Sequence, residues 1–298
     1  MKVVYFGNRE IGCACLEEIL DLRCEVPLVV TYPPDPSEAP GFRCLAEVAA
    51  ARGLSVAIPP DASGKDLHEQ LGEIAPDLVL SVYYGHRIPR AVRSIPRLGA
   101  LNMHGSLLPR WRGRAPLPWV ILAGDAEAGV TLHEMVHAMD AGDVYGRERF
   151  PVGPRDTATD LYGKTTAAAR ALLRRVLPLV EAGTAPVEVQ DHALATVAPP
   201  LMPEREVDRS CTVDRFDRVV RAFARPYPGA RTPMGGDFAV IRAGEPGRRP
   251  GGIVIPLADG EYTILRLSLE GADEDAAAAF LAVHPEAPRI LGLRAGAP

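Results

Sequence analysis

Short apolar runs alternate with segments of helical spacing along the first half of the chain. The apolar runs, which predict buried strands, cover residues 2–6, 25–31, 54–58, 77–82, 98–102 and 129–135. The segments between and after them carry apolar side chains three or four positions apart and predict helices at 11–20, 44–51, 65–74, 89–95 and 156–180. Apolar strands that alternate with helices are typical of a doubly wound, mostly parallel sheet covered on both faces. We therefore predict an α/β fold for this part of the chain.

The pattern changes near residue 189. Residues 189–204 are rich in Ala and Pro and show no apolar period, which predicts a linker. Beyond the linker, a helical pattern at 213–224 precedes short strand patterns between Gly-rich turns, at 238–241, 252–256 and 262–268. We predict a larger catalytic domain over residues 1–188 and a smaller β-rich domain over residues 205–298.

Composition and charge narrow the class of protein. Of the 298 residues, 47% are hydrophobic and 24% are charged, as in soluble globular proteins. No apolar run is long enough to span a membrane, and the N-terminus lacks a signal-peptide pattern, so we predict a cytoplasmic protein. The five cysteines lack the spacing of zinc ligands, which predicts free thiols and no metal site.

The charge balance bears on the kind of partner. The net charge is −5 at pH 7, and Lys occurs only at Lys2, Lys65 and Lys164. Proteins whose main partner is nucleic acid usually carry a basic stripe. We therefore expect no nucleic-acid partner. A homodimer stays an open alternative.

Candidate chemistry gathers in two segments at the ends of predicted strands. Residues 101–116 read Leu-Asn-Met-His-Gly-Ser-Leu-Leu-Pro-Arg-Trp-Arg-Gly-Arg-Ala-Pro, so Asn102 and His104 lie two positions apart. Side chains two positions apart on an extended chain point to the same side. Asp140 follows the strand predicted at 129–135. Because ligands of doubly wound sheets bind at the carboxyl ends of strands, we expect these three side chains to converge for proton transfer and oxyanion stabilisation.

Several other chemistries find no support in the sequence. Gly7 and Gly12 do not form the dinucleotide fingerprint and the P-loop Lys is missing, so neither NAD nor ATP is indicated. No nucleophile elbow is present, so no covalent intermediate is predicted. His133 lies in the middle of a strand pattern and is predicted to be structural. For His137, a pocket wall and a plain loop both stay open.

Two segments, Asn102–Pro116 and Gly129–Gly142, the second reading Gly-Val-Thr-Leu-His-Glu-Met-Val-His-Ala-Met-Asp-Ala-Gly, resemble the core of the folate-dependent formyltransferases. That family includes methionyl-tRNA formyltransferase and the UDP-aminoarabinose and other sugar N-formyltransferases. The resemblance extends over residues 1–190 and continues more weakly through 221–230. It implies 10-formyltetrahydrofolate as the formyl donor, a primary amine as the acceptor and an OB-like fold for the C-terminal domain.

The resemblance also implies roles for single residues. Asn102 would stabilise the oxyanion, His104 would carry the proton, and Asp140 would orient His104 and raise its pKa. Loops 84–88 and 136–140 would form the two walls of a slot for the pterin ring. The residues implied in folate binding are His86, Arg87, Ile88, Ser106, Leu107, Leu108, Pro109, Arg114, Val136, His137, Ala138 and Met139. Arg114 could meet either a folate carboxylate or an acidic group of the substrate.

Departures from the family pattern bear on the acceptor. The tRNA enzymes carry a basic insertion near residues 33–45, where this chain is acidic and rich in Pro, and a Trp where this chain has Arg209. The UDP-sugar branch carries paired Arg at a place where residues 197–203 have none. We therefore expect a small-molecule amine: an amino sugar, an amino acid or a natural-product intermediate. The alternatives are methionyl-tRNA formyltransferase, a UDP-4-amino-sugar N-formyltransferase and a folate-binding protein without transfer activity.

Overall fold

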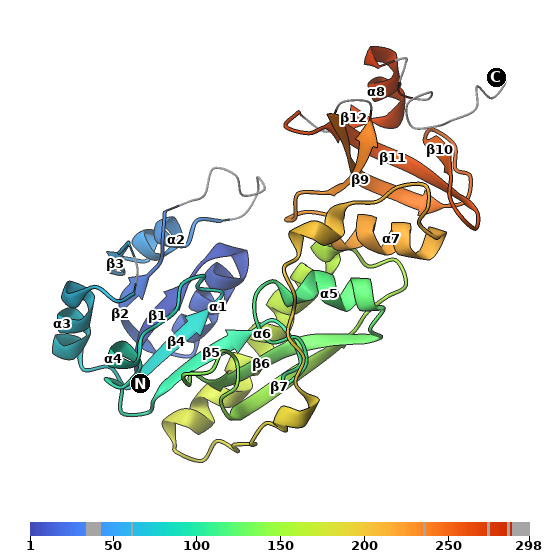
Figure 1. The fold of residues 1–298 in the computed structure, drawn as a ribbon. Coiled ribbons are helices and arrows are strands. Elements are labelled where there is room, and N and C mark those ends of the chain that lie inside the picture. The colour runs from blue at the N-terminus through green and yellow to red at the C-terminus, as the bar shows by residue number, and fades with distance from the viewer. Residues whose placement is uncertain (34–42, 61, 235–236, 273–274, 285–286, 288–298) are drawn as a thin grey trace. The chain divides into compact units, whose positions relative to one another are not determined.

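The computed structural model describes residues 1–33, 43–60, 62–234, 237–272, 275–284 and 287 (Figure 1). The chain divides into two compact units. Unit 1 comprises Met1–Pro116, Glu127–Pro151 and Tyr162–Ala198, and unit 2 comprises Leu117–Ala126, Val152–Leu161 and Pro199–Pro298. The segment predicted as a linker, 189–204, contains the last boundary between the units, and its first half belongs to unit 1.

Within the described residues, unit 1 is built on a seven-stranded sheet in the order β3-β2-β1-β4-β5-β6-β7 (Figure 1). Its strands are β1 (Lys2–Gly7), β2 (Glu25–Val30), β3 (Val56–Ala57), β4 (Leu78–Val82), β5 (Ala100–His104), β6 (Glu127–Glu134) and β7 (Val144–Pro151). The strands from β3 to β5 run parallel, whereas β6 and β7 are antiparallel to their neighbours. The prediction of an α/β fold with a mostly parallel sheet is confirmed.

Helices follow most of these strands. They are α1 (Arg9–Asp21), α2 (Leu45–Ala51), α3 (Lys65–Ile74), α4 (Arg90–Arg93), α5 (Pro116–Ala123) and α6 (Ala158–Glu181). The longest, α6, begins at a capping box in which the Asp160 carboxylate accepts from the Thr157 backbone N–H at 2.9 Å. No helix among the described residues is both long and apolar enough to cross a membrane.

One face of the sheet forms a buried apolar core that anchors the site. Val4, Phe6, Leu28, Val30 and Val79 supply the sheet side of this core. Leu67 and Leu71 of α3 and Val92 of α4 cover it, and Ile88, from the loop after β4, packs into the same cluster. Burial of this size contributes roughly 1.5–3 kcal/mol per large apolar side chain. The loop that carries Ile88 is therefore held by the core.

Three elements differ from the sequence-based expectation. Strand β6 was expected in a parallel sheet but is antiparallel to β5, because an apolar run does not encode strand direction. Strand β7 was not expected, since its sequence is largely polar and only its first residue is buried. Helix α5 was also missed, because its residues are apolar on all sides and carry no helical period.

Unit 2 contains the β-rich C-terminal region that was expected. Helix α7 (Val213–Ala222) is followed by an antiparallel sheet in the order β10-β11-β9-β8, with β12 beside β11. The described elements are β8 (Ala230–Met234), β9 (Asp237–Pro246), β10 (Ile253–Pro256), β11 (Glu261–Leu269), β12 (Asp275–Ala276) and α8 (Ala277–Val283). Phe216 of α7 packs against Tyr262 of β11, with ring centroids 4.9 Å apart.

Candidate active site

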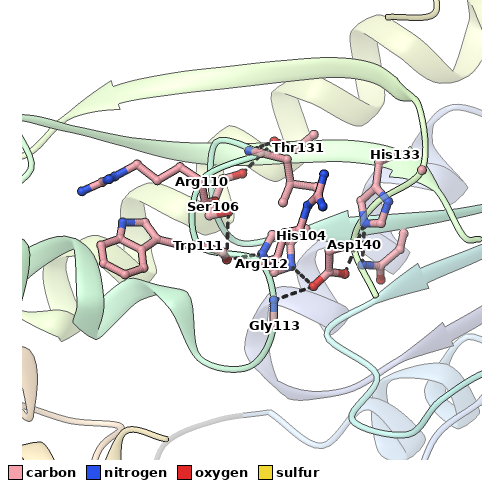
Figure 2. A network of polar contacts seen from close by, with 12 residues as sticks. His104, Ser106, Arg110, Trp111, Arg112, Gly113, Thr131, His133 and Asp140 are labelled. Carbon is pink, nitrogen blue, oxygen red and sulfur yellow. Dashed lines mark hydrogen bonds and ion pairs between the residues drawn. The ribbon is translucent and has the colours of Figure 1, made fainter. Parts of the chain in front are cut away.

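The candidate site lies where β5 meets β6. Asn102 and His104 are two positions apart on β5, as expected for side chains that face the same side. The antiparallel register places His133 opposite Asn102 and Thr131 opposite His104. Asp140 follows β6 in the loop before β7, and Figure 2 shows its carboxylate between His104 and His133. The structure therefore brings together the three side chains singled out in the sequence and adds a second histidine.

His104 is held between a carbonyl and a carboxylate. Its Nε2 lies 2.9 Å from the Trp111 carbonyl oxygen, and its Nδ1 lies 3.6 Å from Asp140 Oδ2. A carbonyl can only accept a hydrogen bond, so Nε2 carries the hydrogen and Nδ1 carries the lone pair of the neutral ring. The side chain is only 7% exposed. The basic nitrogen of His104 therefore faces a carboxylate in a nearly dry environment.

Burial and Asp140 act on His104 in opposite directions. Burial, the larger effect, lowers the pKa of His104 below its usual 6.5, and Asp140 raises it. The expected raising influence of Asp140 is present, but burial outweighs it because the charged ring loses its hydration. At neutral pH His104 is therefore uncharged and can act as a base.

Asp140 is fixed as an anion. Its Oδ2 accepts from the Gly113 backbone N–H at 2.7 Å, and its Oδ1 lies 3.6 Å from His133 Nε2. Burial would raise the pKa of Asp140, but His104, His133 and the Gly113 N–H together lower it to about 2. The residue itself is in the left-handed region, with φ of 53°. That conformation is uncommon outside glycine, so surrounding contacts must hold it.

His133 is the residue for which the sequence predicted a structural role. Its Nδ1 lies 2.8 Å from the Glu134 carbonyl oxygen, which assigns the hydrogen to Nδ1. Its Nε2 then accepts from Asn102 Nδ2 at 3.1 Å. The prediction of a structural His133 did not foresee these contacts with Asn102 and Asp140. The signal that could have found it is the pairing of β5 with β6, which the apolar pattern did not reveal.

The turn at 106–109 is tied to the sheet. Thr131 Oγ1 donates to the Ser106 carbonyl at 2.7 Å and accepts from the Leu108 N–H at 3.0 Å. Ser106 and Leu108 are buried, whereas Leu107 and Pro109 are partly exposed. Ser106 and Leu108 therefore anchor the turn, and Leu107 and Pro109 are the members with surface to offer a ligand.

Loops 84–88 and 136–140 are linked by arginines. Arg87 Nη2 donates to the His137 carbonyl at 3.0 Å and lies 3.1 Å from His137 Nδ1. Arg93 donates to the carbonyl oxygens of Ile88 and Met135. The two segments expected to form one slot thus lie side by side, although they are far apart in the sequence.

The side chains of these two loops divide into anchors and exposed groups. Ile88 points into the core, so only its backbone can meet a ligand. His86 stacks on Tyr32 with ring centroids 5.3 Å apart. The other loop exposes its predicted binding residues, with Met139 63% exposed and Val136 37% exposed, and His137 and Ala138 are exposed as well.

The two arginines near the turn differ in their contacts. Arg112 Nη2 donates to Gln190 Oε1 at 2.6 Å and lies 2.9 Å from His192 Nδ1. Arg114 is exposed and, among the described residues, makes no hydrogen bond or ion pair. The Arg114 guanidinium is thus not engaged by a carboxylate in the described part of the chain. In the part of the chain that the structure describes, no group of three or more His, Cys, Asp and Glu residues is arranged to hold a metal ion.

The chain is similar to proteins of known family and fold. A family model described as formyl transferase matches residues 1–177. HypX from Aquifex aeolicus in complex with tetrahydrofolic acid is 20% identical, with a TM-score of 0.71 over 98% of this chain and 48% of that chain. An N-formyltransferase from Helicobacter canadensis in complex with folinic acid and dTDP-3-aminofucose is 18% identical, with a TM-score of 0.64 over 89% of this chain and 98% of that chain.

A third similar structure covers less of the chain. Glycinamide ribonucleotide transformylase 1 from Symbiobacterium toebii is 21% identical, with a TM-score of 0.54 over 64% of this chain and 94% of that chain. This chain spans about half the length of the HypX chains that it matches. At these identities the solved structures share the fold.

Proposed function

The chain belongs to the formyl transferase family, and from that premise we propose that it transfers the formyl group of 10-formyltetrahydrofolate to the primary amine of a small molecule. One observation carries the proposal. A neutral, buried His104 presents its basic nitrogen toward an anionic Asp140, with the Asn102 amide on the same strand. This arrangement can remove a proton from an attacking amine and hold negative charge on an oxygen.

The described residues suit a folate donor. Exposed Val136 and Met139 offer apolar surface to a flat ring. The exposed residues beside them, 86–87 and 137–138, would offer backbone hydrogen-bonding groups to the ring edge. Arg114 offers a cation to the glutamate carboxylates or to an acidic substrate. When bound, the donor supplies a formyl carbon attached to a nitrogen that can leave.

The proton that moves in the reaction would pass through His104. Its Nδ1 would accept the proton released by the attacking amine, since the 3.6 Å separation from Asp140 leaves that lone pair unused. The imidazolium would then be stabilised by Asp140, and the same proton would pass to the leaving nitrogen. One proton is taken up and one is given back, so the residue returns to its neutral state.

Asn102 would supply the oxyanion contact. Its amide nitrogen carries two N–H groups, and one is directed at His133 Nε2. The other would donate to the formyl oxygen as negative charge develops there. Loss of one such donor typically slows turnover by roughly a hundredfold to a thousandfold.

A small-molecule acceptor fits the charge of the chain better than tRNA does. The net charge is −5, and many arginines of unit 2 are paired with carboxylates. An amino sugar, an amino acid or a natural-product intermediate all remain within the proposed class. The N-formyltransferase from Helicobacter canadensis, bound to dTDP-3-aminofucose, shows that a similar fold can accommodate a nucleotide sugar. This favours amino sugars for the first assays.

The test is formyl-donor turnover against a panel of amines and initiator Met-tRNA. We expect turnover with at least one small amine, and a loss of roughly two or more orders of magnitude in His104→Ala and Asn102→Ala. Asp143→Asn is the matched control, because Asp143 lies three positions from Asp140 outside the contacts around His104. Wild-type turnover that is preserved in His104→Ala would remove His104 from the mechanism. Turnover with tRNA alone would replace the small-molecule assignment.

A further inference from the structure

Residues 188–198, here called the strap, fall largely in the stretch that the sequence predicted as a linker. They nevertheless contact both the loop that contains Asp140 and the segment 111–112, which supply the two partners of the His104 ring. We propose that Gln190 of the strap is a positioning residue that sets Asp140 against His104. This inference rests on the proposed function, because it assigns a task to Gln190 within the same site. Gln190 is only 3% exposed, although it is polar.

Both the nitrogen and the oxygen of the Gln190 side-chain amide are hydrogen-bonded. Its Nε2 donates to the Asp140 carbonyl at 2.9 Å and to the Gly142 carbonyl at 2.6 Å, and its Oε1 accepts from Arg112 Nη2 at 2.6 Å. Backbone carbonyls only accept and a guanidinium only donates, so the amide has one permitted orientation. The side chain therefore links the backbone on both sides of residue 141 to the segment that contains Trp111 and Gly113.

The strap also fixes the other partner of His104. The Arg112 N–H donates to the Thr196 carbonyl at 2.8 Å, and the Ala198 N–H donates to the Arg112 carbonyl at 2.8 Å. The Trp111 N–H donates to Thr196 Oγ1 at 2.9 Å. The Trp111 carbonyl is the acceptor for His104 Nε2. One segment thus holds both the carbonyl and the carboxylate between which His104 lies.

The backbone conformation of Asp140 requires stabilisation by surrounding contacts. It adopts a left-handed backbone conformation with φ of 53°. The four residues that precede it are exposed, so they offer little packing to fix it. Gln190 is a buried contact at this turn, and its two hydrogen bonds flank the strained position. A carboxylate that moves by about 1 Å can cost a catalytic step on the order of a hundredfold.

The first test is a double-mutant cycle with Gln190→Met and Asp140→Asn. Met keeps the length and volume of Gln but cannot donate to the two carbonyls. We expect Gln190→Met to lower kcat by about tenfold to a hundredfold with little change in KM for the formyl donor. In the Asp140→Asn background the same change should have almost no further effect, because its target is already lost. Losses that multiply in the double variant would show that Gln190 acts elsewhere and would overturn the proposal.

The matched control is Gln70→Met. Gln70 is the other glutamine of the chain and is exposed on α3. It should leave kcat, KM and thermal unfolding unchanged. If Gln190→Met does not fold, Gln190→Glu carries the test, because a carboxylate still accepts from Arg112 but cannot donate to the Asp140 and Gly142 carbonyls. A several-fold lower kcat in Gln190→Glu supports the proposal, and an unchanged kcat overturns it.

A second measurement does not depend on turnover. Asp140, from the loop after β6, raises the pKa of His104, while His133 of β6 and burial lower it. In Gln190→Met, a displaced Asp140 should let the pKa of His104 fall toward its value in Asp140→Asn, as read from the histidine resonances in an NMR titration. An unchanged His104 titration would overturn the proposal. Absence of formyl transfer in the wild type would instead refute the proposed function, and the titration would still decide the role of Gln190.

Discussion

At the scale of single residues, the site depends on a histidine that is kept neutral by burial and ready to become charged beside Asp140. Protonation in advance would remove the base, so activity should fall as the pH drops through the pKa of His104. Burial places this pKa below 6.5, so we expect the acid limb of kcat/KM, which reports the free enzyme, to have its midpoint below pH 6.5. Asp140→Asn removes a charge that raises the pKa and should move the midpoint further down, in addition to lowering kcat/KM. The measurement is kcat/KM against pH for both proteins.

The control for this pH profile is Asp143→Asn, which should keep the wild-type midpoint. A wild-type midpoint above 6.5 would show that the Asp140 carboxylate outweighs burial in setting the pKa of His104.

The lowered pKa of His104 also affects the stability of the fold. Because the unfolded chain binds the proton of His104 more readily, stability should rise with pH between the folded pKa and 6.5, and be lost as the pH falls through that window.

The sequence identified part of this site for clear physical reasons. Asn102 and His104 could be placed on the same side of one strand because side chains two positions apart on a strand face the same way. Asp140 could be added because it follows the next predicted strand, at 129–135. His133 could not be identified in this way. Its contact with Asn102 exists only because β6 is antiparallel to β5 and in one register. Gln190 was missed for a similar reason, since its partners lie about fifty and eighty positions away in the sequence.

At the scale of elements, the turn from β6 to β7 has no room for a side chain at residue 142. A Cβ on Gly142 would lie 2.1 Å from the Glu134 backbone oxygen. We expect Gly142→Ala to destabilise the fold by roughly 1–3 kcal/mol and to lower kcat, because the displaced turn carries Asp140. Denaturant unfolding and formyl transfer measure the two effects.

Gly163→Ala is the control for Gly142→Ala. A Cβ on Gly163 of α6 would meet nothing within 4 Å. Because Ala favours helices more than Gly does, this variant should be stabilised by about 0.5–1 kcal/mol with normal turnover. Equal stability of the two variants would contradict the close approach at residue 142.

The two loops of the expected folate slot should respond to a ligand as one unit. Binding of 5-formyltetrahydrofolate should slow hydrogen exchange at 84–88 and 136–140 together. Arg87→Gln should weaken this joint protection, because the Arg87 guanidinium links the first loop to His137. Arg90→Gln, which changes an exposed arginine three positions along, should not. Protection confined to unit 2 would refute the assignment of the slot.

Elements were predictable where burial and period coincide. Helix α3 was expected at its observed bounds, and β1, β2 and β4 lie within one residue of theirs, because their apolar residues face one continuous core. Only Val144 of β7 is buried, so the polar sequence of this strand lacks an apolar alternation. Helix α5 is apolar throughout, so no face is marked. Helix α5 lacks a marked face and β7 lacks an apolar run, so neither segment carries a pattern of the kind from which the other elements were predicted.

At the scale of the whole molecule, the charge of the chain bears on the class of acceptor. Within the described part of unit 2, carboxylates pair with Arg205, Arg215, Arg218, Arg221, Arg231, Arg248 and Arg249. Phosphate contacts need cations that are not already neutralised in this way. The acidic Pro-rich stretch that replaces the basic insertion of the tRNA enzymes lies mostly outside the described residues, so the pairing in unit 2 is an independent argument.

We therefore expect no useful formylation of initiator tRNA. Residual tRNA binding should collapse between about 50 and 200 mM salt, while folate binding changes little over the same range. The measurement is kcat/KM with Met-tRNA beside the best small amine of the panel. A value of about 10⁴ M⁻¹s⁻¹ or more with Met-tRNA would promote the tRNA alternative over the small-molecule one.

The division of the chain into two units limits where it can be cut without separating parts of one unit. Residues 117–126 and 152–161 belong to unit 2 although the sequence on both sides of each belongs to unit 1. Arg155, from the second of these segments, is bonded to the buried Asp217 of α7, and Trp119, from the first, donates to the Pro199 carbonyl. A gene cut at residue 198 would therefore leave each product without part of itself. A chimaera that takes its C-terminal unit from a relative should therefore also take residues 117–126 and 152–161 from that relative.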